Sequence, residues 1–166
     1  MEEVTGRSFD LGELRNIFGS FPSGVTALCA MVDDVPVGMA ASSFASVSMD
    51  PPLVSICVQN ESRTWKRLQN STSLGISVFA EAQREECLRM SLKEGDRFAR
   101  VEWEQSGRGA VHLKNAAATL TCRLHSVVPA GDHGIALLRV DDASCDHDVD
   151  PLIFHRSMFR ALQLLS

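Results

Sequence analysis

The chain lacks the features of membrane, secreted and nucleic-acid-binding proteins. No apolar run in its 166 residues approaches the length of a membrane span, and the first residues, MEEVTGRSFD, lack the basic and then apolar order of a signal peptide. Lys and Arg number 16 against 21 Asp and Glu, whereas phosphate backbones require a basic surface. We therefore expect a cytoplasmic protein that binds neither nucleic acid nor a membrane.

The sequence also lacks a C-x-x-C motif. Its cysteines are odd in number and widely spaced, which favours buried thiols in a reducing compartment: Cys29, Cys57, Cys87, Cys122 and Cys145. Cys122-x-x-His125 and Cys145-x-His147 could be assembled into a zinc site, but residues three apart on a strand point to opposite faces. No motif marks a cysteine as a nucleophile. We predict neither a metal site nor a catalytic cysteine, and both stay open as alternatives.

Strands dominate the predicted secondary structure, and helices are few. Periodicity and breaker residues predict helices over 10–21, 62–70 and 81–92, and strands over 25–32, 37–48, 53–59, 73–80, 110–130, 133–145 and 151–155. A loop or a short helical turn is expected over 93–103. Because there is no strand–helix–strand alternation and no linker, the sequence favours one domain, residues 1–166, built as a closed antiparallel barrel with peripheral helices.

The helices carry more detailed expectations. Asp10 is the expected N-cap of the first helix, and Ser62 or Thr64 begins the second. The apolar stripe of the first helix consists of Leu11, Leu14, Ile17, Phe18 and Phe21. The inner side of the third is expected to hold Cys87, Leu88 and Leu92. The tail over 156–165 is expected to form a last helical turn or to dock on a partner chain.

One segment has an unusual composition. In GMAASSFASVSMDPPL, ten of sixteen residues are Gly, Ala, Ser or Pro. Small side chains leave backbone N–H and C=O groups accessible, so a flat polar heterocycle could lie edge-on against such a strand. The following NESRTWKRL places hydroxyls and basic side chains at a helix start, which suits a phosphate. Together they describe a mononucleotide site, although close strand packing and an ordinary helix cap explain the same residues.

The longer segment VPVGMAASSFASVSMDPPLVSICVQNESRTW resembles the flavin reductase-like family of FMN-binding split-barrel proteins, the reductase components of two-component flavin monooxygenases. The resemblance continues in GDRFARVEW, AGDHGIALLRV and PLIFHRSMFRAL, in matching order over residues 10–162. It implies a mainly β fold, a six-stranded Greek-key antiparallel barrel with peripheral helices. It also implies a homodimer that holds FMN, or less often FAD, near the dimer interface.

The resemblance assigns binding roles residue by residue. The flavin would contact Gly38, Met39, Ala40, Ala41, Ser42, Ser43, Val58, Gln59, Asn60, Ser62, Thr64 and Phe98. Arg97 matches a segment that approaches the cofactor in relatives. The nicotinamide nucleotide would be bordered by His133, Arg156 and Phe159. The family's C-terminal motif usually has Tyr or Phe, then Arg-Gly and Tyr. This chain reads HRSMF there, contains no tyrosine, and has Leu138 where glycine is frequent.

The implied activity is NAD(P)H:flavin oxidoreduction, in which reduced flavin passes to a separate oxygenase. Hydride transfer from nicotinamide C4 to flavin N5 needs stacked rings at close range, so no catalytic residue is predicted. The first alternative is a split-barrel protein that holds flavin or haem without an enzymatic role. A second is oxidase chemistry of the pyridoxamine-phosphate type, which would call for a more basic phosphate pocket.

Overall fold

A computed structural model describes residues 8–165 of the chain. In chain order its strands are β1 (Ser23–Gly24), β2 (Thr26–Val32), β3 (Val35–Ala41), β4 (Ala45–Met49), β5 (Pro52–Gln59), β6 (Leu74–Val78), β7 (Trp103–Ser106), β8 (Ala110–Leu113), β9 (Ala118–Ala130), β10 (His133–Cys145), β11 (Ile153–His155) and β12 (Met158–Arg160). One sheet has the order β4-β5-β10-β9-β6-β2-β8-β7, with β3 also paired to β2, and a smaller sheet has the order β1-β11-β12.

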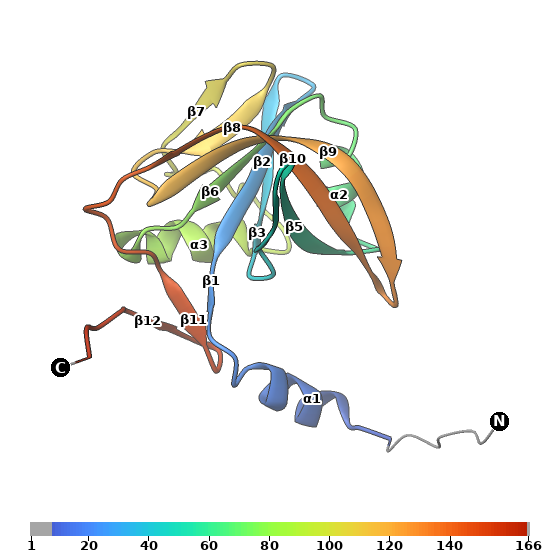
Figure 1. Ribbon diagram of the computed structural model, residues 1–166, viewed down its shortest axis with the longest axis vertical. Helices are drawn as coiled ribbons and strands as arrows, with labels where there is room; N and C mark the ends of the chain where they lie inside the picture. The colour runs from blue at the N-terminus through green and yellow to red at the C-terminus, as the bar shows by residue number, and fades with distance from the viewer. Residues whose placement is uncertain (1–7, 166) are drawn as a thin grey trace.

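A bent segment closes the barrel. β3 pairs antiparallel with β2, whereas β4, which follows after three residues, pairs antiparallel with β5. The ladder β2-β6-β9-β10-β5 connects the same two partners around the other side (Figure 1). This arrangement confirms the predicted mainly β antiparallel barrel with peripheral helices. The prediction of a single strand over 37–48 is wrong, because residues 42–44 leave the ladder while the chain changes partner.

β2 lies between two hydrophobic clusters and contributes side chains to both. Successive strand residues point to opposite faces, and all residues of β2 from Thr26 to Ala30 are buried. Leu28 and Ala30 belong to a cluster inside the barrel, together with Ile56 and Leu138. Ala27 and Cys29 belong to a second cluster outside it, which includes Phe79, Met90 and Leu113. The continuous apolar run predicted as a strand is therefore a strand buried on both faces.

The helices lie at the periphery and confirm the predicted caps. α1 (Leu11–Phe18) begins after Asp10, whose carboxylate accepts the N–H groups of Gly12 and Glu13. It ends three residues earlier than predicted and buries no residue. α2 (Arg63–Leu68) begins after Ser62, whose hydroxyl accepts the N–H of Trp65 at 3.1 Å. None of the helices in the described part of the chain is long and apolar enough to cross a membrane.

The helix predicted over 81–92 is divided and turned differently than expected. It begins as a 3₁₀ turn, η1 (Glu81–Gln83), and continues as α3 (Arg84–Met90). Cys87 is buried as predicted, but Leu88 and Leu92 are each 42% exposed. The buried face instead follows Gln83, Cys87 and Met90, whose side chains are spaced four and three residues apart.

The C-terminal region forms a β-hairpin, so the prediction of a final helical turn is wrong. β11 and β12 pair antiparallel around Arg156 and Ser157, which have positive φ of 51° and 60°. Such a two-residue turn matches the twist of paired strands and is incompatible with a helix. The hairpin pairs with β1 and lies beside α1, where the N–H of Arg156 donates to the carbonyl of Gly19 at 3.0 Å (Figure 1).

Gly75 tests how tightly β6 and β8 pack. A Cβ added at this position would lie 2.1 Å from the carbonyl oxygen of Val111, a backbone atom. Gly75→Ala is therefore expected to lower the free energy of unfolding by about 3 kcal/mol, measured by urea denaturation. Gly24→Ala is the matched control, since its Cβ would meet nothing within 4 Å. Equal stability of the two variants would contradict this packing.

Candidate functional site

The outer edge of β3 is the starting point of the site. Among the described strands, β3 pairs with β2 alone. The carbonyl of Ala41 accepts from Thr26 on β2, whereas that of Gly38 accepts from Arg97 on the opposite edge. Because backbone groups alternate along a strand, the N–H and C=O of Ala40 point to the same edge as those of Gly38. A row of backbone donors and acceptors beside small side chains therefore faces away from the barrel ladder.

A pocket of about 430 Å³ lies along this edge. Its lining joins Met39, Ala40, Ala41, Ser42, Ser43, Gln59, Ser62, Thr64 and His133, all predicted from the sequence, with Cys57, Met90, Ser91 and Arg97. This volume falls in the range of small-molecule sites. The structure thus brings most of the predicted residues to one cavity.

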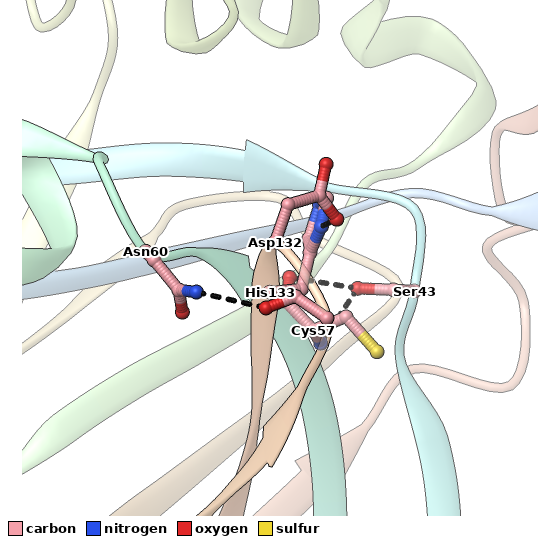
Figure 2. Close-up of polar contacts among 6 residues, drawn as sticks. Ser43, Cys57, Asn60, Asp132 and His133 are labelled. Carbon is pink, nitrogen blue, oxygen red and sulfur yellow. Dashed lines mark hydrogen bonds and ion pairs between the residues drawn. The ribbon is translucent and has the colours of Figure 1, made fainter. Parts of the chain in front are cut away.

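Ser43 lines this pocket and ties the bend to β5. Its hydroxyl accepts the N–H of Cys57 at 2.9 Å and donates to the carbonyl of the same residue at 3.2 Å (Figure 2). The side chain thereby replaces a ladder pair between the bend and β5. The hydroxyl of Ser43 is therefore occupied within the protein, and its backbone is what it offers to a ligand.

His133 is held at the pocket by two neighbours. Its Nδ1 lies 2.7 Å from a carboxylate oxygen of Asp132, and this hydrogen bond and the charge of His133 lower the pKa of Asp132 below its ordinary value (Figure 2). In the β5–β10 ladder His133 lies opposite Gln59. The side-chain amide of Asn60 donates to the carbonyl of Gly131 at 3.2 Å, which ties the β9–β10 turn to the end of β5. With Asp132 accepting from Nδ1, Nε2 of His133 is available to accept a hydrogen bond from a ligand in the pocket.

Arg97 connects three segments around the pocket. Its Nη1 donates to the carbonyl of Gly38 at 2.7 Å and to the hydroxyl of Thr64 at 3.0 Å. Its Nε donates to the carbonyl of Leu92 at 2.7 Å. Partial burial lowers the pKa of Arg97 below its usual value. The guanidinium remains charged, so it supplies a positive charge where the pocket meets Thr64.

The remaining predicted residues lie elsewhere or contribute differently. Val58 is buried in the barrel core, so only its backbone is available. Gly38 and Phe98 line a second groove that adjoins the pocket at Thr64 and Arg97. The rings of Phe159 and Phe154 meet edge to face, with 5.6 Å between their centroids. Both residues line a small cavity of about 140 Å³, which shares Ala40 to Ser42 with the pocket. Arg156, in the hairpin turn, lines none of these cavities.

Sequence reasoning missed three lining residues. Cys57 has the same strand parity as Gln59, and β5 alternates buried and accessible residues over this stretch, so period-two reasoning would have found it. Met90 and Ser91, at the end of α3, reach the pocket only through the tertiary fold. No local signal in the sequence places them there.

The cysteines show no metal cluster within the described residues. Cys122 is buried in the barrel while His125, three residues on, is exposed. Cys145 Sγ lies 3.4 Å from His147 Nε2 on the exposed end of β10, far along that strand from His133. Neither pair brings a third ligand.

The sequence pattern that defines the flavin reductase like domain matches residues 18–163. The chain belongs to the flavin reductase-like family. This membership confirms the family named from the sequence, and the pocket lies where that resemblance assigned a flavin.

Individual members of the flavin reductase-like family resemble the chain over most of its length. The reductase subunit HsaB of a flavin-dependent monooxygenase from Rhodococcus jostii is 36% identical, over 98% of this chain and 87% of that protein. A flavin reductase from Pseudomonas putida is 32% identical, over 93% and 91%. The NADH:FAD oxidoreductase SgcE6 from Streptomyces globisporus, solved with NAD and FAD fragments, has a TM-score of 0.87 at 34% identity and 93% coverage of each chain.

The arrangement determines what the pocket can do chemically. Backbone groups on β3 can hydrogen-bond the polar edge of a planar ring, and Arg97 with Thr64 can hold an anionic group at one end. His133, across the pocket, presents a hydrogen-bonding nitrogen. No side chain in the lining is placed as a nucleophile beside a base, so covalent catalysis has no support among the described residues.

Proposed function

We propose that the chain is an NAD(P)H-dependent flavin reductase that supplies reduced flavin to a separate oxygenase. The observation that carries this proposal is the unpaired edge of β3, which opens onto a pocket shared with His133. The relatives named as reductase subunits of flavin-dependent monooxygenases support the same activity and the same kind of partner. They favour reduction over the alternative of a protein that only holds flavin.

The residues present fit a flavin. The small side chains from Ala40 to Ser43 let the isoalloxazine edge reach backbone N–H and C=O groups, and Thr64 with Arg97 receives the phosphate. FMN is the simplest ligand with these parts. Bound flavin supplies the chemistry, because its N5 accepts a hydride from the nicotinamide of NAD(P)H.

The chain's own residues orient the reactants. β3 holds one edge of the ring system and leaves a face open, so that two rings can stack at close range. His133, fixed by Asp132, orients the nicotinamide nucleotide, and Phe159 lines the adjoining small cavity that shares Ala40 to Ser42. No proton acceptor is required in the hydride step. Arg156 lies outside the described cavities of one chain, so a role toward NAD(P)H requires a second chain or a movement of the hairpin.

A steady-state assay tests the activity. Oxidation of NADH or NADPH in the presence of FMN or FAD should be accelerated well above the rate with free flavin alone. His133→Ala is expected to raise the KM for the nicotinamide nucleotide about tenfold through loss of one hydrogen bond, with a smaller change in the flavin KM. Oxidation no faster than with free flavin would remove the proposal. Without oxygen, NADH should bleach bound flavin, whereas a pure binder would leave it coloured.

The cysteines provide a test of the site that is independent of turnover. Burial raises the pKa of Cys29, Cys87 and Cys122 to about 12, 11 and 12, so these thiols stay protonated and unreactive at pH 8. Cys57 and Cys145 are exposed, but only Cys57 lines the pocket. Saturating FMN or FAD should therefore slow the modification of Cys57 by a thiol reagent, read by peptide mass spectrometry.

Cys145 serves as the internal control in that experiment. Its modification rate should not change when flavin is added, because it lies at the other end of β10 from His133. Equal protection of both thiols would indicate a general effect on the protein. Protection of neither, at flavin concentrations that bind, would place the flavin away from this pocket.

We also propose that the chain works as a homodimer. Within residues 8–165 the apolar stripe of α1 is left uncovered, since Leu11, Ile17, Phe18 and Phe21 are 51–80% exposed. Leu162, Leu164 and Leu165 of the tail are exposed as well. Several large apolar side chains exposed on one helix are typical of an interface. Light scattering should give twice the chain mass of 18.1 kDa, and a mass of 18.1 kDa would contradict the dimer. Cytoplasmic location stays a prediction.

A further inference from the structure

A second groove adjoins the flavin pocket and differs from it in charge. It has a volume of about 510 Å³ and is bounded by the start of β3, one face of α2 and the loop over 93–98. Thr64 and Arg97 belong to the lining of both cavities. The two cavities therefore meet at the position proposed above for the flavin phosphate.

The groove is basic in an acidic chain. Its lining contains four basic side chains and two acidic ones, while the chain as a whole has a net charge of −5. The basic side chains are Arg63, Arg67, Lys93 and Arg97, and the acidic ones are Glu94 and Asp96. Arg63 and Arg67 are four residues apart, so they share one face of α2. A local excess of positive charge on an acidic protein favours an anionic ligand at that place.

The two acidic residues do not neutralise the groove. Glu94 lies 3.9 Å from Arg63, and both side chains are more than 80% exposed, so this ion pair is weak. Asp96 accepts the backbone N–H of Phe98 at 2.9 Å. Within residues 8–165, Arg67 and Lys93 form no ion pair. These two cations are available to a ligand.

We propose that this groove binds the adenosine diphosphate half of FAD, and that Arg67 and Lys93 make the chain prefer FAD over FMN. The inference rests on the proposed function and names its flavin. FAD continues beyond the FMN phosphate with a second phosphate, a ribose and an adenine. Basic side chains bind the added phosphate, and arginine guanidinium planes stack on aromatic rings such as adenine.

NAD(P)H carries the same adenosine diphosphate group, so the position of the groove decides between the two sources. The groove continues the flavin pocket at Thr64 and Arg97, the proposed phosphate end. His133, the residue proposed for the nicotinamide nucleotide, lines the flavin pocket but not the groove. A dinucleotide whose ring lies on β3 reaches the groove directly.

Calorimetric titration of the purified full chain with FMN and with FAD tests the preference. FAD is expected to bind about tenfold more tightly than FMN, as two added charge-assisted contacts at an exposed site would give. The double variant Arg67→Ala with Lys93→Ala should remove this difference and leave the affinity for FMN within about twofold. Both side chains are exposed, so the fold should persist. AMP, which carries only the part of FAD beyond the FMN phosphate, should compete with FAD but not with FMN.

Arg108→Ala is a single-charge control, since this exposed arginine lies in the β7–β8 turn and lines neither cavity. It should change neither affinity. FAD binding no tighter than FMN would overturn the inference while leaving the reductase proposal intact. Equal weakening of both flavins by the double variant would also overturn it.

The double variant also separates the two sources of the adenosine diphosphate group. If it raises the KM for NADH and keeps the preference for FAD, the groove belongs to the nicotinamide nucleotide and the inference fails. If the wild-type chain binds neither flavin, the proposed function fails together with it. Each failure thus has its own signature.

Discussion

The structure depends on a strand that changes its partner. The small-residue segment follows β2 as β3, leaves the ladder over 42–44, and joins β5 as β4. The hydroxyl of Ser43 bridges the gap through both backbone groups of Cys57. Because β3 has no second ladder partner in the described chain, its outer edge keeps backbone donors and acceptors that a barrel strand would normally pair. The same feature closes the barrel and opens the pocket.

A rigid scaffold surrounds this edge. β2 is buried on both faces and separates an inner cluster from an outer one, so that β3 is supported by a strand with packed side chains on both sides. Gly38 allows close contact there, because a Cβ at this position would lie 2.4 Å from Cys29 Sγ. Such support restricts movement of the pocket wall. A ligand held by backbone groups then meets a surface whose geometry is already fixed.

Much of this architecture follows from the sequence, and the remainder shows what a single sequence omits. The alternation of β5, the continuous apolar run of β2 and the caps at Asp10 and Ser62 are local patterns, and the structure confirms them. The bend at Ser43 is not local, since it depends on Cys57, fourteen residues away. The resemblance to a known family carried the assignment of the flavin residues, because small residues alone are equally consistent with close strand packing.

The errors have similar physical causes. The third helix was oriented by its leucines, but the outer core selects Cys87 and Met90 because Phe79 and Leu113 lie on that side. The C-terminal hairpin depends on two consecutive positive φ angles at Arg156 and Ser157. Arginine and serine do not favour this conformation, so the sequence gives no sign of the turn. Met90 and Ser91 reach the pocket from an element distant in sequence. Tertiary contacts decide each of these positions.

Arg97 illustrates how folding prepares a binding group in advance. A guanidinium has five N–H donors, and the protein engages three of them through Leu92, Gly38 and Thr64. Within the described part of the chain, the two donors of Nη2 have no partner and remain available to a ligand. Since the long side chain is already immobilised, an arriving anion does not have to restrict its rotamers. The orientation of those two donors also fixes the direction from which an anion can approach and the angle at which its oxygens are bound.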